Sequence, residues 1–206
     1  SLVAVENTVN KGGGAYWNFT ELQKISTLCR DRKIGFHMDG ARLFNAITET
    51  GETPDQYGKL FDSISICISK GLGAPVGSLL LGNSDFIKRA RRIRKVFGGG
   101  MRQAGFLAAA GIYALEHNVK RLGEDHRKAR EIGKILSTLP YIEDVIPVET
   151  NILIFKTSID EKDFLFKLKE KGILATAFGP KTIRFVTHLD FTEDMLNRTI
   201  DILKSI

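Results

Sequence analysis

The sequence predicts an α/β protein, with a largely parallel sheet in its first part and a smaller α+β unit at its end. In the first part, strand-like apolar runs alternate with stretches of helical periodicity, which is typical of parallel strands joined by helices. After Leu139 the composition shifts, and two strand-like runs then bracket a single helical pattern. The boundary between the two parts is expected near residues 116–123, inside or just before the polar helix. We therefore expect two domains, residues 1–118 and residues 119–206.

Four runs in the first part have strand character because they are short, apolar and rich in β-branched residues. They are residues 2–8, 34–39, 61–69 and 77–82. The first is expected to be a buried strand, and the last two are close enough in sequence to lie side by side in the sheet.

Helical periodicity marks residues 19–31, where Thr20 is a plausible N-cap, and residues 86–97, which "GGG" terminates. Further expected elements are a tightly packed helix rich in alanine and glycine at 101–115, a polar helix at 119–139, strands at 150–157 and 182–188, and helices at 161–171 and 192–206.

The composition predicts an ordinary soluble chain. Its 206 residues are 43% hydrophobic and 26% charged, enough to bury a core without disulfides. No apolar run reaches the ~18 residues that span a bilayer, and the start "SLVAVENT" lacks the basic region of a signal peptide. Cys29 and Cys67 have no metal-ligand spacing, which favours a reducing cytoplasm and predicts no metal. Since Ser1 opens directly onto a strand, we expect a piece of a longer protein.

Much of the net charge of +6 lies in "KRARRIRK", residues 88–95. Three interpretations are open: a solvated helix face, a nucleic-acid surface, or an anion site. The nucleic-acid interpretation lacks interleaved aromatic residues and a binding fold. The anion interpretation rests on Lys95 and Arg102, which flank the triglycine, because cations beside glycine-rich backbone suit a phosphate.

Lys70 is the only cation in "SISICISKGLGAPVGSLLLG". It follows a predicted strand and precedes a glycine-rich turn, so it is expected at the carboxyl edge of the sheet, where α/β proteins bind ligands. Partial burial there makes an amine nucleophilic. The alternative is a strand-end lysine that reaches water.

Three more residues carry candidate chemistry. In "HMDGARLF", Asp39 follows a strand, where it could pair with a pyridinium nitrogen or simply cap a helix. Arg42 follows three residues later, whereas His37 is interpreted as a core histidine or as one that supports a ligand-binding residue, rather than as a ligand. In "TIRFVTH", Arg184 lies between apolar residues, and such an arginine commonly binds a carboxylate or phosphate, a structural salt bridge being the alternative. An amine, an acid, an anion site and a carboxylate ligand are together what an enzyme of pyridoxal phosphate needs.

The sequence strongly resembles one family along its whole length. The strings "ENT", "HMDGARLFNA", "SISICISKGLGAPVGSLLLG", "RARRIRKVFGGGMRQAGFLAAAGIYAL" and "IRFVTHLD" are similar to those of low-specificity L-threonine aldolases, in the β-eliminating lyase group of fold type I pyridoxal-phosphate enzymes. The fold implied is the C-terminal part of such an enzyme: part of the large α/β domain plus the small α+β C-terminal domain.

The resemblance implies roles residue by residue. Lys70 corresponds to the Schiff-base lysine and Asp39 to the partner of the pyridine nitrogen. Arg42 and Arg184 correspond to ligands of the substrate carboxylate. Lys95 and Arg102 correspond to residues on the phosphate side of the cofactor. In the family, which is typically homotetrameric, part of that contact comes from a neighbouring subunit.

The family's activity is aldol cleavage of L-threonine or L-allo-threonine to glycine and acetaldehyde. The chain departs from the family in reading "ENTVN" where "ENTHN" is frequent, so Val9 receives no catalytic role. The family's long stretch before "ENT" is also missing. We expect the rest to lie on a companion N-terminal chain or to have been lost by truncation or cleavage, and the 206 residues alone to be inactive. The alternatives are another β-eliminating lyase, a transaminase of the same fold, or a non-catalytic fragment.

Overall fold

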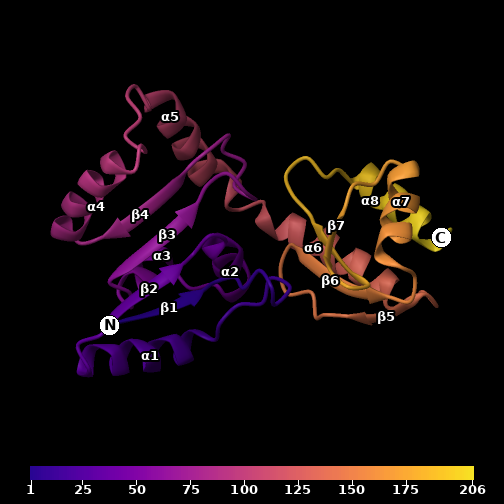
Figure 1. The fold of residues 1–206 in the computed structure, drawn as a ribbon, viewed down its shortest axis with the longest axis horizontal. Helices are drawn as coiled ribbons and strands as arrows, with labels where there is room; N and C mark the ends of the chain where they lie inside the picture. The colour runs from indigo at the N-terminus through magenta and orange to yellow at the C-terminus, as the bar shows by residue number, and fades with distance from the viewer. The chain divides into compact units, whose positions relative to one another are not determined.

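The computed structural model describes residues 1–206, which divide into two compact units (Figure 1). The first unit contains residues 1–8 and 16–120, and the second contains residues 9–15 and 121–206. The short loop 9–15 therefore belongs to the second unit, although the residues before and after it belong to the first. The expected domains, residues 1–118 and residues 119–206, are stretches that fold independently, which a division into compact units does not test. That expectation stays a prediction.

The first unit is built on a four-stranded sheet in the order β1-β2-β3-β4. Strands β1, β2 and β3 are parallel, and β4 is antiparallel to β3. The elements are β1 (Leu2–Glu6), α1 (Phe19–Asp31), β2 (Gly35–Asp39), α2 (Leu43–Thr50), α3 (Pro54–Gly58), β3 (Ser63–Cys67), β4 (Ser78–Gly82), α4 (Ser84–Val96), α5 (Gly105–Tyr113) and the π-helix η1 (Ala114–Asn118). The largely parallel α/β sheet expected from the sequence is confirmed.

Helix α1 has the expected bounds but a different N-cap. The side chain of Asn18, rather than Thr20, accepts hydrogen bonds from the backbone N–H groups of Thr20 and Glu21, at 2.9 and 3.4 Å. The prediction of Thr20 was therefore wrong. An asparagine directly before the helix satisfies two N–H groups that a cap inside the first turn cannot reach.

Two expectations about burial were also wrong. Strand β1 lies at the edge of the sheet with its residues only partly covered, and Leu2 is 65% exposed. Helix α5 buries only Gly111, while Phe106 is 90% exposed. Apolar and alanine-rich composition shows that a segment can be packed, but it does not show which part of the protein covers it.

The second unit has an antiparallel sheet in the order β5-β6-β8-β7. Its elements are α6 (Leu122–Leu136), β5 (Ile142–Val145), β6 (Ile152–Thr157), α7 (Glu161–Glu170), β7 (Thr176–Gly179), β8 (Thr182–Val186) and α8 (Glu193–Lys204). Strands β6 and β8 and helices α7 and α8 agree with the sequence prediction, whereas β5 and β7 were missed. Phe155, Phe164 and Leu203 belong to one core cluster that joins the three helices to the sheet.

None of the helices combines the length and the apolar character that crossing a membrane requires.

Candidate functional site

The candidate site of the first unit lies at the carboxyl edge of its parallel strands. Strands β1, β2 and β3 run in the same direction, and their registers pair Glu6 with Asp39 and Asp39 with Ser65. Their carboxyl ends therefore meet at one edge of the sheet, where open α/β sheets bind ligands.

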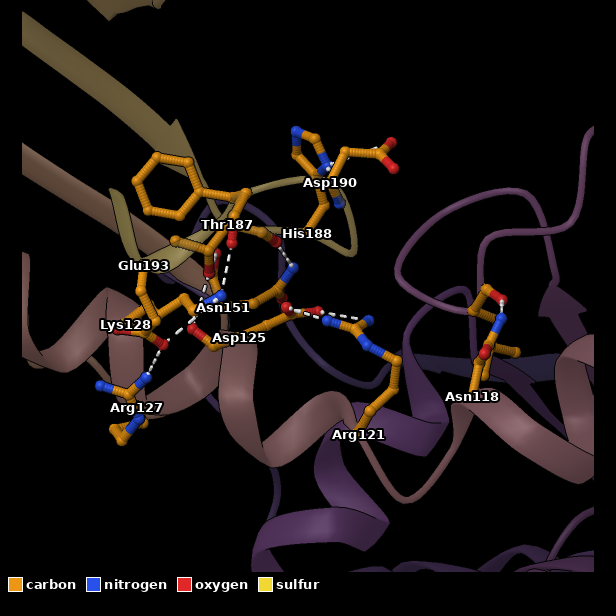
Figure 2. A network of polar contacts seen from close by, with 12 residues as sticks. Asn118, Arg121, Asp125, Arg127, Lys128, Asn151, Thr187, His188, Asp190 and Glu193 are labelled. Carbon is orange, nitrogen blue, oxygen red and sulfur yellow. Dashed lines mark hydrogen bonds and ion pairs between the residues drawn. The ribbon is translucent and has the colours of Figure 1, made fainter. Parts of the chain in front are cut away.

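Lys70 lies three residues beyond β3, and backbone hydrogen bonds fix the turn that follows it. The N–H of Gly73 donates to the carbonyl oxygen of Lys70 at 2.8 Å, and that of Ala74 donates to Ile68 at 3.0 Å. The side-chain amide of Asn118 also donates to the carbonyl oxygen of Leu72 at 2.7 Å (Figure 2). The Lys70 ammonium is exposed and has no carboxylate partner. An anchored backbone thus presents an unpaired amine.

Asp39 is the last residue of β2, and its side chain is exposed. Its Oδ1 accepts a hydrogen bond from the N–H of Ala41 at 3.1 Å, while its carbonyl oxygen accepts one from the N–H of Asn7 at 2.9 Å. Asp39 does not cap α2, since the N-cap of that helix is Arg42. The carboxylate is therefore held by a two-residue turn at the sheet edge.

Arg42 and Lys70 line the same small hollow, together with residues from the start of α2 and the turn after Lys70. The volume of the hollow is about 10 Å³, so it holds nothing larger than a water molecule. The structure thus brings these two predicted site residues together, whereas Asp39 lies at the same sheet edge without lining the hollow.

Lys95 and Arg102 lie elsewhere in the first unit. Lys95 is in the last turn of α4 and Arg102 follows the triglycine, and both side chains are exposed. Neither lines the hollow beside Lys70. The structure of this chain therefore does not join them to the other candidates, and their contact with a phosphate stays a prediction.

Arg184 belongs to the second unit, in the middle of β8. Its Nη1 donates to Oδ1 of Asn10 at 3.0 Å, and its guanidinium carbon lies 5.1 Å from the centroid of the Phe178 ring. Its Nε is buried and has no hydrogen-bond partner. A buried donor without an acceptor is costly and needs an explanation, and a carboxylate ligand would supply the acceptor.

The first unit contains polar groups that sequence reasoning missed. Nδ2 of Asn7 and Oγ1 of Thr8 are buried without a partner just beyond β1, at the same sheet edge as Asp39. Their signal was the string "ENT", but only the fold shows that they are buried and unsatisfied. Nδ1 of the half-buried His37 lies 2.8 Å from Oγ of Ser63 on the neighbouring strand.

Cys67 lies close to Lys70. Burial by itself raises the pKa of the Cys67 thiol, but the hydrogen bonds of Ser69 and the positive charge of Lys70 outweigh burial, so the pKa lies below its ordinary value. Cys67 also lines the hollow. The positive charge of Lys70 therefore favours the thiolate of Cys67, but it does so beside the hydrogen bonds of Ser69.

These residues fit the chemistry of pyridoxal phosphate. The edge offers an amine for an aldehyde, a carboxylate for a pyridinium nitrogen, a guanidinium, and two unsatisfied buried groups in Asn7 and Thr8. The described residues alone do not enclose a cavity of the cofactor's size around Lys70. No group of three or more His, Cys, Asp or Glu side chains is placed to hold a metal ion.

Comparison with known proteins gives a consistent result. The model of the family described as beta-eliminating lyase matches residues 1–159. The low specificity L-threonine aldolase of Escherichia coli K12 is 43% identical over 196 residues, which are 95% of this chain and 57% of that protein. The probable low-specificity L-threonine aldolase of Schizosaccharomyces pombe is 38% identical, over 100% of this chain and 51% of its own length.

Among solved structures, a putative aromatic amino acid beta-eliminating lyase/threonine aldolase from Exiguobacterium sp. 255-15 superposes with a TM-score of 0.83 at 26% identity. The match covers 98% of this chain and 61% of that one. The expected α/β fold of fold type I enzymes is confirmed, while the expectation that the chain is the C-terminal part of such an enzyme stays a prediction. The chain spans about half the length of the curated relatives it matches.

Proposed function

The chain belongs to the β-eliminating lyase family, and we propose that the complete protein is a pyridoxal-phosphate-dependent aldolase. It cleaves L-threonine and L-allo-threonine to glycine and acetaldehyde, a carbon–carbon lyase reaction. The observation that carries the proposal is Lys70: an unpaired, exposed ammonium on an anchored turn at the carboxyl edge of a parallel sheet. The names of the two curated relatives support the substrate.

In this proposal Lys70 supplies the amine that holds the aldehyde of the cofactor. The cofactor, when bound, supplies an electron sink for the pair released as the Cα–Cβ bond breaks. The carboxylate of Asp39 keeps the ring nitrogen protonated, because an anion at that position stabilises the cation. Its hydrogen bond with Ala41 holds the carboxylate in place at the sheet edge.

We propose substrate-carboxylate binding for Arg42 and for Arg184, each for its own reason. Arg42 lines the hollow beside Lys70. Arg184 has an unpartnered buried Nε and a planar donor set that a carboxylate matches. A guanidinium that fixes the carboxylate determines which bond at Cα is aligned for cleavage, so its contribution is orientation as well as affinity.

We further propose that the cytoplasmic protein acts as a homotetramer, with Lys95 and Arg102 contacting the cofactor phosphate, and that the 206 residues alone are inactive. The first unit exposes apolar side chains on β4, α4 and α5, among them Leu80, Val96 and Phe106 at 43%, 76% and 90%. Exposed apolar surface of this extent is typical of an interface with other polypeptide. A companion N-terminal chain or segment would also complete the hollow beside Lys70.

The test compares the complete protein with its Lys70→Ala and Lys59→Ala variants. Lys59 is the control because it is an exposed lysine at the end of α3, paired with Asp55 and away from the hollow. We expect K70A to lose the visible absorbance of bound cofactor and acetaldehyde release from threonine, and K59A to keep both. Retention of the absorbance in K70A contradicts the assignment of Lys70. Amino transfer without acetaldehyde release makes the protein a transaminase instead.

A further inference from the structure

A cavity of about 430 Å³ lies within the second unit, beside the end of β8. One wall is formed by β8 and the residues after it, and the other by α8 and the segment between α7 and β7. Its lining is largely apolar and includes Ile132, Phe185, Phe191 and Met195. None of its lining residues belongs to the first unit.

The edge of β8 that borders this cavity has no strand partner at Val186. The N–H of Thr187 donates to the carbonyl oxygen of Asn151 at 3.0 Å, so Thr187 and Phe185 direct their backbone groups toward β6. Backbone groups alternate along a strand, and those of Arg184 and Val186 therefore point to the other edge. Strand β7 covers that edge only as far as Arg184, which pairs with Thr176.

Buried polar contacts fix the backbone next to the open edge. Oγ1 of Thr187 donates to the carbonyl oxygen of Asp125 at 2.7 Å, and Nδ2 of Asn151 donates to that of Thr187 at 2.9 Å (Figure 2). The buried ammonium of Lys128 donates to the carbonyl oxygen of Phe191. A partner strand would thus meet a preformed edge, which lowers the entropic cost of binding.

The ionisable residues that line the cavity are all basic: Arg184, His188 and Arg198. Arg184 donates from Nη1 to Asn10, and its guanidinium is the one proposed above to bind the substrate carboxylate, so it is not assigned to the segment. His188 lies 3.9 Å from the carboxylate of Asp190. Arg198 donates to the carbonyl oxygen of Lys171 at 3.2 Å and has no carboxylate partner, so a single acidic group in the cavity would complement it.

We propose that this cavity receives an extended polypeptide segment that adds a strand to β8 at Val186. The segment places an apolar side chain between Phe185 and α8 and an acidic side chain beside Arg198. Main-chain hydrogen bonds supply affinity and the alternating side chains supply specificity, as in other strand additions. Its source is the polypeptide that the curated relatives have outside the matched range.

Photo-crosslinking in the complete protein tests the proposal. The photoreactive residue p-benzoylphenylalanine replaces Leu174, which lines the cavity and is 83% exposed. The control position is Phe166 on α7, which is 61% exposed and does not line the cavity. After irradiation and proteolysis, mass spectrometry is expected to find Leu174 joined to one contiguous segment outside these 206 residues, and Phe166 not joined to it.

A charge reversal and an exchange measurement complete the test. Arg198→Glu is expected to lower the Leu174 cross-link several-fold, while Lys167→Glu on the exposed face of α7 leaves it unchanged. The amide of Val186 is expected to exchange about a hundredfold more slowly than the amide of an unpaired strand edge, because a partner strand would protect it.

Three results would overturn the proposal. The first is a cross-link from position 174 to another site within the 206 residues, and the second is a cross-link to a second copy of the chain in a mixed-isotope sample. The third is the absence of any cross-link together with fast exchange of the Val186 amide. The proposal rests on family membership and not on the proposed reaction. The threonine-cleavage assay can therefore be negative while the cross-link is found, and it can be positive while the cross-link is absent, so the two failures are distinguishable.

Discussion

Replacing Gly14 by alanine should destabilise the second unit strongly, because this glycine anchors the loop that residues 9–15 contribute to it. Gly14 is buried and has a φ of +80°, a left-handed conformation that costs alanine about 1–2 kcal/mol. A Cβ atom there would lie 2.3 Å from Oγ1 of Thr150, which now donates to the carbonyl oxygen of Gly14 at 2.8 Å.

The hydroxyl of Thr150 must therefore rotate away and lose its buried hydrogen bond. An unsatisfied buried hydroxyl and carbonyl together cost about 1–3 kcal/mol. Together with the backbone strain of about 1–2 kcal/mol, the expected loss of unfolding free energy is about 2–5 kcal/mol.

The matched control is Gly172→Ala in the same unit. Gly172 has a φ of +86°, but a Cβ there would meet only the end of the Arg198 side chain, at 3.5 Å. We expect G172A to lose only the backbone term of about 1–2 kcal/mol. Urea unfolding followed by circular dichroism measures both variants. A Gly14→Ala midpoint equal to that of G172A, at unchanged m-value, would refute the reasoning.

Three further predictions concern single side chains. Asp125→Asn removes the wholly buried negative charge that pairs with Arg121. The cation left without a counter-charge should lower the free energy of unfolding by about 3 kcal/mol or more, seen as a lower Tm; an unchanged Tm contradicts this. Burial raises the pKa of the half-buried Tyr141 to about 12, above its value in the unfolded chain. The contribution of the protonated hydroxyl to the free energy of unfolding is therefore complete below pH 10 and is lost as the pH rises toward 12. Solvent screening limits this loss to about 1–2 kcal/mol, and Tyr141→Phe should lack the alkaline slope that wild type shows in pH-dependent unfolding. Cys67 should be alkylated at lower pH than an ordinary thiol, and Lys70→Gln should shift that profile upward; an unshifted profile rules out the influence of the Lys70 charge.

Local patterns in the sequence predicted the parts of the fold that local physics determines. Alternating β-branched residues located β3, and its antiparallel neighbour β4 followed from proximity. Lys70 could be placed at the carboxyl edge because a strand ends just before it and a glycine-rich turn begins just after it. These inferences need only the chain direction and the geometry of one strand.

Other features depend on contacts between distant residues and were not predictable. The short β7 has a bulge in its pairing with β8, so its alternation is broken. The surroundings of Arg184 combine Phe178 of β7 with Asn10, which is 174 residues away in sequence. Helix α5 is largely exposed, and the helix's own composition does not encode which parts of the protein pack against it.

The central claim is that Lys70 is the amine that holds the cofactor. Borohydride treatment of the complete protein with bound pyridoxal phosphate, followed by peptide mass spectrometry, tests it most directly. The account predicts a phosphopyridoxyl group on the peptide that contains Lys70 and on no other lysine peptide. A label on a different lysine, or none on a protein that binds the cofactor, would contradict it.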